Sequence, residues 1–353
     1  MRNHSLVTSM DSPLKLIEKT ERLERLALSE AEFIMEELLS GRVATPEIVR
    51  LLVALNERLI IPHELGGFAR VMRRHAAPVF VAGAAPPKNL VDTCGTGGDD
   101  SGTFNISTAA AFVAAAAGAP VAKHGNRSVS SRSGSADVLE ALGVRIDLPM
   151  EHSGRAIHEL GIGFLFAPAA HAAARHAIAA RKQIGKRTVF NLLGPLTNPA
   201  GAETQLLGVY SPDLLDLVAV TLAELGVRRA FVVHGFGGLD EISLAGETLV
   251  AEVREGGVKR FVLSPEDFAV PRASSQMIQG GTPQENAALI RRIFGGEGGA
   301  RRDIVLINAA AVLVVTGVAE DFREATDLAA KAISSGAALE KLERLKSFTN
   351  AGH

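Results

Sequence analysis

The chain has 353 residues, of which 47% are hydrophobic and 22% are charged, and its formal net charge is −2. This composition excludes wholesale disorder, and the near-neutral charge argues against a sequence-independent nucleic-acid binder, which needs a large cationic excess. A single cysteine, Cys94, excludes an internal disulfide framework. The length predicts two domains, or one large domain with a smaller companion.

The N-terminal part of the chain has a helical pattern. Residues 1–14 are polar and lack the apolar core of a secretion signal, so we expect a flexible extension there. In residues 15–85 apolar side chains recur at helical spacing, and Pro46 and Pro62 stand where a first helical turn accepts proline. We therefore predict a small helical domain over residues 15–85, and the proline-rich residues 84–88 mark its boundary.

After this boundary the pattern changes to alternating strands and helices. Apolar runs predict strands at residues 89–93, 119–123, 144–148, 162–166, 204–210 and 229–234. Helical segments separate most of them, which predicts an α/β domain over residues 89–349 with a mostly parallel central sheet flanked by helices. Residues 247–282 indicate short strands and loops. Part of residues 186–202, which is rich in proline, can return to the helical domain.

Two apolar segments, residues 109–121 and 304–318, fall short of the roughly 20 residues that a membrane-spanning helix needs. The second segment also contains Asn308. We therefore predict two buried helices and no membrane association. Together with the single cysteine, this favours a soluble protein of the reducing cytoplasm.

The most informative segment covers residues 92–108. Here a strand is followed by a glycine-rich turn and then by hydroxyl and amide side chains at the start of a helix. Glycines let backbone N–H groups converge on an anion, and the helix N-terminus adds partial positive charge. The segment therefore predicts a phosphate site. For Cys94, which lies within it, a packed thiol fits better than a nucleophile because the sequence shows no histidine partner.

A second polar cluster, residues 123–137, follows the next predicted strand. It combines Lys123 with an amide and several hydroxyls, which suits a phosphate or diphosphate because lysine supplies charge and hydroxyls supply directed hydrogen bonds. The alternative is a solvated serine-rich loop in which Ser135 caps the following helix. His124 is more often a structural side chain or a hydrogen-bond donor than a general base.

A third cluster places Asp240 and Glu241 in a glycine-rich turn after the strand at residues 229–234. Mg²⁺ prefers oxygen ligands and commonly bridges carboxylates to substrate phosphates. An adjacent acidic pair is by itself usually a solvated turn. Because the carboxyl ends of parallel strands share one edge of a sheet, the two phosphate clusters favour metal binding here.

Four motifs, in this order, resemble the anthranilate phosphoribosyltransferases of tryptophan biosynthesis. They are residues 92–108, residues 123–131 with 134–143, residues 187–199, and residues 238–241. The resemblance implies transfer of the phosphoribosyl group of 5-phosphoribosyl 1-diphosphate to anthranilate, with Mg²⁺ as cofactor. It also implies an active site between the two domains and a homodimer formed through the helical one. The chain departs from the family pattern at Asp100, where glycine is usual, and at Ala172, where proline is usual.

Carried over motif by motif, the resemblance assigns three roles. The phosphoribosyl donor would be contacted by Gly95, Gly98, Asp99, Thr103, Asn105, Ser107, Thr108, Lys123, Gly125, Asn126, Ser131 and Ser135. Anthranilate would be met by Gly95, Asn126 and Arg181. The metal would be served by Ser107, Asp240 and Glu241. No general base is assigned, because an aromatic amine is already neutral at pH 7.

The local sequence does not distinguish Arg181 from Arg175, Lys182 or Arg187, so its assignment depends on the resemblance alone. Three other functions stay open. A nucleoside phosphorylase of related architecture would use free phosphate. A phosphoribosyltransferase of the other common fold usually has two acidic residues before its glycine-threonine turn, whereas here only Asp92 precedes it. A non-catalytic relative that binds nucleic acid would have lost parts of these loops and gained basic surface.

Overall fold

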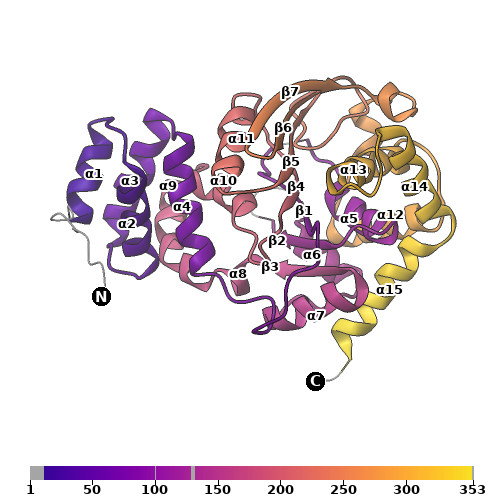
Figure 1. Cartoon of the computed structure of the whole chain (residues 1–353), viewed down its shortest axis with the longest axis horizontal. Coiled ribbons are helices and arrows are strands. Elements are labelled where there is room, and N and C mark those ends of the chain that lie inside the picture. The colour runs from indigo at the N-terminus through magenta and orange to yellow at the C-terminus, as the bar shows by residue number, and fades with distance from the viewer. Residues whose placement is uncertain (1–11, 100, 129–131, 352–353) are drawn as a thin grey trace.

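The computed structural model describes residues 12–99, 101–128 and 132–351. A small N-terminal helical bundle lies beside a larger α/β part (Figure 1). This arrangement confirms the predicted fold class. Most of the expected extension, residues 1–14, falls outside the described residues, as do Ser131 of the predicted donor site and the family departure Asp100.

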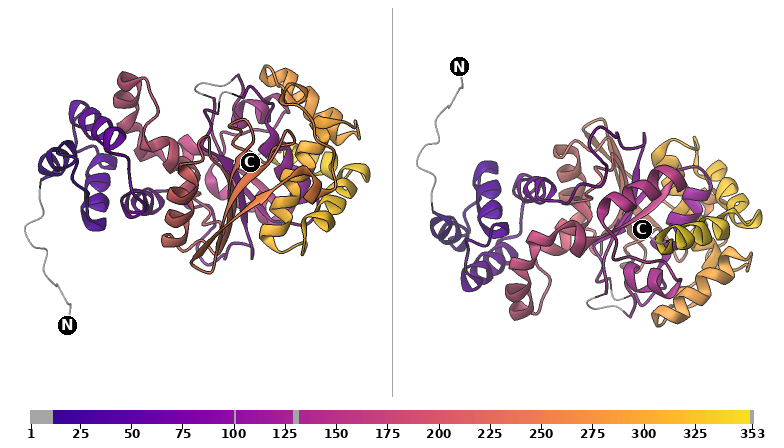
Figure 2. Two further views of the ribbon diagram at one scale, coloured as in Figure 1. Left: turned by 90° about the horizontal axis from the view of Figure 1, so that it is seen from above. Right: turned by 90° about the horizontal axis from the view of Figure 1, so that it is seen from below.

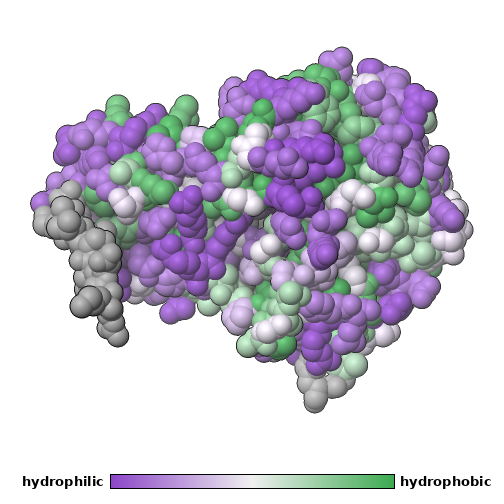
Figure 3. Space-filling view, viewed as in Figure 1, coloured by the Kyte–Doolittle hydropathy of each residue, from purple (hydrophilic) through white to green (hydrophobic). Residues whose placement is uncertain are grey.

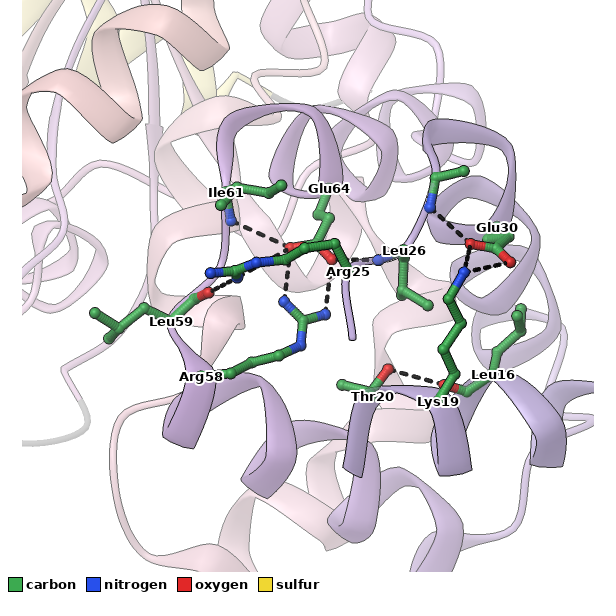
Figure 4. A network of polar contacts seen from close by, with 11 residues as sticks. Leu16, Lys19, Thr20, Arg25, Leu26, Glu30, Arg58, Leu59, Ile61 and Glu64 are labelled. Atoms are coloured by element: carbon green, nitrogen blue, oxygen red, sulfur yellow. Dashed lines mark hydrogen bonds and ion pairs between the residues drawn. The ribbon is translucent and has the colours of Figure 1, made fainter. Parts of the chain in front are cut away.

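Four helices form the bundle: α1 (Pro13–Glu21), α2 (Leu28–Leu39), α3 (Thr45–Arg58) and α4 (Pro62–Arg74). Glu64 is fully buried and lies at the centre of the polar contacts within the bundle. Its carboxylate accepts two hydrogen bonds from Arg58, at 2.9 and 2.7 Å, and one each from the backbone N–H groups of Leu26 and Ile61 (Figure 4). Because leaving one partner of a buried ion pair unpaired costs about 3–5 kcal/mol, this network fixes how α4 lies on its neighbours.

Seven strands form one sheet in the order β3-β2-β1-β4-β5-β6-β7. Their bounds are β1 (Val91–Gly95), β2 (Val121–Gly125), β3 (Ile162–Phe166), β4 (Thr204–Gly208), β5 (Arg229–Gly235), β6 (Thr248–Arg254) and β7 (Gly257–Leu263). The strands from β3 to β5 pair in parallel, and β6 and β7 continue the sheet antiparallel. In the register of β1 with β4, Gly95 lies opposite Gly208, so both strands end level at one edge.

Helices cover both faces of this sheet (Figure 2). On β5, Phe231 and Val233 pack into one apolar cluster, and Ala230 and Val232 pack into the other, on the opposite face. Side chains alternate along a strand, so a strand buried on both faces must be apolar at every position. The first cluster includes side chains of α5 (Ile106–Ala116), α6 (Ser135–Ala141), α7 (Met150–Leu160), α12 (Pro283–Phe294), α13 (Ala300–Thr316), α14 (Phe322–Ser334) and α15 (Ala337–Asn350).

The other face carries the helices that connect the sheet to the bundle. They are α8 (Ala167–Ala170), the 3₁₀ helix η1 (Ala172–Ala177), α9 (Ile178–Ile184), α10 (Val189–Leu196) and α11 (Leu214–Glu224). Both α9 and α10 pack against α3, and α10 and α11 also pack against α4. Arg73 of α4 donates to the carbonyl of Leu196 at 2.8 Å, and Asn56 of α3 donates to the carbonyl of Arg187, also at 2.8 Å. Two further 3₁₀ helices, η2 (Pro265–Phe268) and η3 (Ser275–Ile278), follow β7.

The prediction of a strand at residues 144–148 is wrong. Val144, Ile146 and Leu148 are buried, as the alternating pattern indicates, but this segment is an extended connection between α6 and α7. Its backbone contacts a helix instead of a strand, since the N–H of Arg145 donates to the hydroxyl of Thr349 in α15 at 3.2 Å. Alternating burial therefore marks an extended segment under a helix as well as a strand.

Within the described residues, no helix has the length and apolar character required to cross a membrane. The face of the molecule seen in Figure 3 mixes hydrophilic and hydrophobic side chains over the bundle and over the α/β part.

Candidate functional site

The turns after β1 and β5 are joined by hydrogen bonds. The backbone N–H of Gly97 donates to Oδ2 of Asp240 at 2.9 Å, and the N–H of Asp240 lies 3.4 Å from Oδ2 of Asp99. Two predicted clusters that lie far apart in the chain therefore form one structure at the carboxyl edge of the sheet, where α/β folds bind ligands.

Two glycines make room for Asp240. A Cβ atom on Gly95 would lie 2.4 Å from the Asp240 carboxylate, and one on Gly208 would lie 1.5 Å from the Asp240 backbone oxygen. At Gly208 no side chain fits without moving the backbone of the turn, whereas at Gly95 the Asp240 carboxylate would have to shift. Gly208 was not predicted from the sequence, because its place opposite Gly95 follows from the pairing of β4 with β1.

Replacing Gly208 with alanine should lower kcat/KM for the phosphorylated substrate by about 100-fold, because a shift of about 1 Å in a positioning turn costs that much. The measurement is steady-state kinetics together with thermal unfolding. Gly257→Ala in β7 is the matched control, since its nearest contact for a Cβ is an ordinary 3.5 Å. Unchanged kinetics in Gly208→Ala would contradict the close approach described for Asp240.

Lys123, in the middle of β2, connects the same region to the start of α5. The residue is 4% exposed, and its ammonium group donates to the carbonyl of Thr93 at 2.5 Å and to the hydroxyl of Ser107 at 3.2 Å. The backbone N–H of Ser107 in turn donates to the carboxylate of Glu241 at 3.0 Å. Ser107, Lys123 and Glu241, predicted from three separate motifs, therefore lie together.

The acidic groups at this edge carry unfavourable charge. Burial, then the charge of Asp99, raises the pKa of Asp240 to about 7. Burial, then the charge of Asp240, raises the pKa of Glu241 to about 8, although Lys123 opposes that rise. A divalent cation would relieve both effects, and carboxylate and hydroxyl oxygens are the donors that Mg²⁺ accepts.

Among the described residues, no group of three or more histidine, cysteine or acidic side chains is arranged to hold a metal ion. Mg²⁺ does not require such a group, because it commonly keeps one or two carboxylates and completes its shell with water and substrate phosphates. The residues present therefore fit a cation that arrives with a phosphorylated ligand.

The turn after β2 is closed by the start of α6. A Cβ on Gly125 would lie 2.1 Å from the hydroxyl oxygen of Ser135, and this hydroxyl donates to the carbonyl of Asn126 at 3.3 Å. Ser135 is the first residue of α6, and Gly134 is its N-cap. Ser135 therefore does not occupy the cap position that the alternative interpretation gave it. The side chain of Asn126 is exposed next to it.

Asn105, the N-cap of α5, connects the first turn to the second. Its Nδ2 donates to the carbonyl of Ser133 at 3.0 Å, and its Oδ1 accepts from Asn286 of α12 at 3.0 Å. Thr103, two residues earlier, forms an isolated antiparallel bridge with Gln279. These contacts fix the segment between the glycine-rich turn and α5.

Gly98 and Thr108, two further predicted donor contacts, differ in how readily a ligand can reach them. Gly98 has a φ of +73°, which favours glycine, and its carbonyl accepts a hydrogen bond from Arg187. Thr108 is 1% exposed, and its hydroxyl oxygen is buried without a hydrogen-bond partner among the described residues. A ligand would therefore meet Gly98 more readily than the side chain of Thr108.

Arg181 lies on α9, with its guanidinium 5.4 Å from the ring centroid of Phe190 in α10. Burial lowers its pKa. The carbonyl of Gly194, also in α10, accepts a hydrogen bond from Nδ1 of His124 at 3.1 Å. Helix α10 therefore contacts both Arg181 and His124 of β2. Among the described residues, no hydrogen bond joins Arg181 to Asn126 or Gly95.

His124 and Asp92 form buried support beneath the turns. Burial, then the neighbouring charge of His171, lowers the pKa of His124 to about 3, so the imidazole is neutral and a weak base. Asp92 is fully buried, and its carboxylate accepts from the backbone N–H of His124 at 3.0 Å. This favours the structural interpretation of His124. Sequence reasoning assigned no role to Asp92, because its partner comes from another strand.

Comparison with known proteins identifies the family of the chain. Residues 14–76 match the helical bundle domain of the glycosyl transferase family, and residues 87–339 match its a/b domain. The chain is 53% identical over 333 residues to the anthranilate phosphoribosyltransferase of Pelotomaculum thermopropionicum, covering 94% of this chain and 95% of the relative. The resemblance predicted from the motifs is thereby confirmed.

Solved structures show the same similarity. The anthranilate phosphoribosyltransferase of Thermus thermophilus aligns with a TM-score of 0.89 and 47% identity, covering 95% of this chain and 99% of that one. The enzyme of Saccharomyces cerevisiae, solved in complex with PRPP and Mg, aligns with a TM-score of 0.88 and 27% identity, covering 98% of this chain and 100% of that one.

Proposed function

Because the chain belongs to the anthranilate phosphoribosyltransferase family, we propose that it transfers the phosphoribosyl group of 5-phosphoribosyl 1-diphosphate to anthranilate. The products are N-(5-phosphoribosyl)anthranilate and pyrophosphate, in a step of tryptophan biosynthesis. The observation that carries this proposal is that the turns after β1 and β5 meet β2 and the start of α5: Gly97 bonds Asp240, and Ser107 connects Lys123 to Glu241.

The donor occupies the edge formed by these turns. Its diphosphate lies against the backbone N–H groups near Gly95 and Gly98 and the start of α5, where a helix N-terminus favours anions. Asp99, Thr103, Asn105, Gly125, Asn126 and Ser135 complete the site, supported by the contacts of the first and second turns. Thr108 supports the site from inside the helix.

Magnesium is the cofactor, held through Asp240 and Glu241 with Ser107 beside them. When bound, the ion neutralises charge on the diphosphate as it leaves. The raised pKa values of both carboxylates support this assignment, since they mark negative charge that the protein alone leaves poorly compensated. The yeast relative solved with PRPP and Mg supports it as well.

The chemistry requires positioning more than proton transfer. The bond between the anomeric carbon of the ribose and the diphosphate breaks, the anthranilate nitrogen forms the new bond to that carbon, and this nitrogen releases one proton to water. The buried ammonium of Lys123 supplies fixed positive charge at this edge, where low solvent exposure strengthens it. His124 is neutral and a poor base, and the proposed mechanism does not use it as a general base.

An assay of anthranilate fluorescence tests the proposal directly. Protein incubated with anthranilate, donor and Mg²⁺ should remove the anthranilate signal, and removal of the metal by a chelator should stop the change. Turnover of a nucleoside with free phosphate and none with the donor would favour the phosphorylase instead. Salt-dependent DNA binding without any turnover would favour the non-catalytic relative.

Arg181 binds the anthranilate carboxylate in this proposal, with Gly95 and Asn126 nearby. Arg181→Ala should raise KM for anthranilate by about 10–100-fold, because a hydrogen bond to a charged group is worth about 1.5–3 kcal/mol, while KM for the donor changes little. Arg175→Ala is the control, since Arg175 is exposed one helix earlier and bonds the backbone of its own helix. Equal changes in both KM values would refute the specific role of Arg181.

We propose that the protein forms a homodimer through the helical bundle. We also propose that it is located in the cytoplasm. Leu23 and Leu59 support this, since they are 57% and 74% exposed. Arg25, two residues after Leu23 in the chain, donates a hydrogen bond to the Leu59 carbonyl (Figure 4).

A further inference from the structure

Asn308 is a fully buried amide in the middle of α13. The helix around it is almost entirely apolar from Ile304 to Val315. Asparagine is a poor helix former, and a buried amide is costly unless its donors and acceptor are paired. Neither helix stability nor packing explains this residue, so its partners outside the helix identify its role.

The side chain of Asn308 binds both backbone groups of one residue, Ile242. Its Oδ1 accepts from the N–H of Ile242 at 3.0 Å, and its Nδ2 donates to the carbonyl of Ile242 at 3.1 Å. The second Nδ2 hydrogen is used within the helix, on the carbonyl of Ile304 at 2.9 Å. The amide thus bonds both backbone groups of Ile242, as a neighbouring strand would, and restricts the movement of that residue.

Ile242 directly follows Glu241 in the chain. On its other side, this segment lies against the end of β5, where a Cβ on Gly235 would be 2.3 Å from the carbonyl oxygen of Glu241. The acidic turn is therefore held between a strand that allows no side chain and a helix that bonds its backbone. Loss of the bonds to Asn308 would free one side of this arrangement.

We propose that Asn308 is a positioning residue for the carboxylates of Asp240 and Glu241, acting through the backbone of Ile242 and not through contact with substrate. The inference rests on the proposed function, because the pair serves a metal-bound donor there. Groups that orient metal ligands from behind typically change metal affinity by about 10–100-fold when they are removed. Asn308 belongs to this class, although it holds the backbone instead of the ligand atom.

The test measures binding of Mn²⁺, as a probe for Mg²⁺, by electron paramagnetic resonance in the presence of 5-phosphoribosyl 1-diphosphate. Asn308→Leu keeps the number and branching of the side-chain heavy atoms and removes the hydrogen bonds, and it should weaken donor-dependent Mn²⁺ binding by about 10–100-fold. KM for anthranilate should stay close to the wild-type value. Deuterium exchange at the Ile242 amide should become faster in the variant. If the leucine variant does not fold, Asn308→Ser provides the same measurements.

Thr316→Val is the matched control. Thr316 is buried on the same helix, and its hydroxyl bonds carbonyls of α13, at 2.8 and 3.1 Å, so the change costs stability without affecting Ile242. Wild-type Mn²⁺ binding in Asn308→Leu, or equal weakening in Thr316→Val, would overturn the positioning role alone. A wild-type chain that binds no Mn²⁺ with the donor would overturn the metal assignment of the proposed function and this inference with it.

Discussion

Asp240→Asn combined with Glu241→Gln should lower Mg²⁺-dependent turnover by about 10²–10³-fold while leaving the fold intact. The loss corresponds to about 3–4 kcal/mol of transition-state stabilisation, the order expected when charge on a leaving group is no longer neutralised by a bound ion. The amides keep the size of both side chains, and the bond from Gly97 to position 240 can still form. The measurement is kcat/KM for the donor over a range of Mg²⁺ concentrations.

The same substitutions should also change how the stability of the protein depends on pH. Both acids have a pKa raised above the ordinary value, to about 7 and about 8, so the folded metal-free protein binds more protons than the unfolded chain between about pH 4 and pH 8. Its free energy of unfolding therefore falls as the pH rises through this range. The double amide variant should show a shallower fall, measured by thermal unfolding with a chelator present.

Glu266→Gln with Asp267→Asn is the control for this pair. These two adjacent acids are exposed in η2, and they contact Arg272 and Ser264 instead of the site. Their replacement should leave the Mg²⁺ response unchanged. A double amide variant of Asp240 and Glu241 with the wild-type Mg²⁺ response would refute the metal assignment.

Lys123→Met should lower kcat/KM for the donor by about 100-fold or more, with a smaller change in KM for anthranilate. The substitution nearly preserves volume but removes the buried cation that lies beside Ser107 and whose charge acts on Asp92 and Glu241. Glu241 would lose the favourable charge that now opposes the rise of its pKa. The measurement is steady-state kinetics with each substrate varied in turn.

Lys341→Met provides the matched control for this lysine. Lys341 is also partly buried, and its ammonium donates to the carbonyl of Leu160 at 2.7 Å, outside the three turns. It should keep wild-type kinetics, although the loss of its bond to the Leu160 carbonyl should lower the melting temperature. Wild-type kinetic constants in Lys123→Met would show that its charge does not serve the donor.

Most of the fold could be predicted because strands that are buried on both faces of the sheet appear in the sequence as short, continuous apolar runs. Strands β1 to β5 are short apolar runs between helical segments, and five of the six predicted strands overlap them. Residues 144–148 were misassigned because alternating burial does not reveal whether the neighbour of an extended segment is a strand or a helix. Neither did the pattern separate β6 from β7 within residues 247–282.

The site could be predicted as far as it consists of local motifs. Glycines and polar side chains at the ends of predicted strands indicated the turns that contain Asp99 and Asp240 and the polar segment that begins at Lys123. Gly208 and Asn308 were missed because their roles depend on what approaches them from distant parts of the chain. Arg181 needed the family resemblance, because a helical arginine carries no local sign of the ring or ligand that it meets.

The most direct test is a crystal structure of the protein with 5-phosphoribosyl 1-diphosphate and Mn²⁺, located by its anomalous scattering. We expect an anomalous peak between the diphosphate and the carboxylates of Asp240 and Glu241, with the diphosphate against the turn that contains Gly98 and beside Lys123 of β2. A diphosphate bound away from these turns, or an anomalous peak remote from both carboxylates, would contradict it.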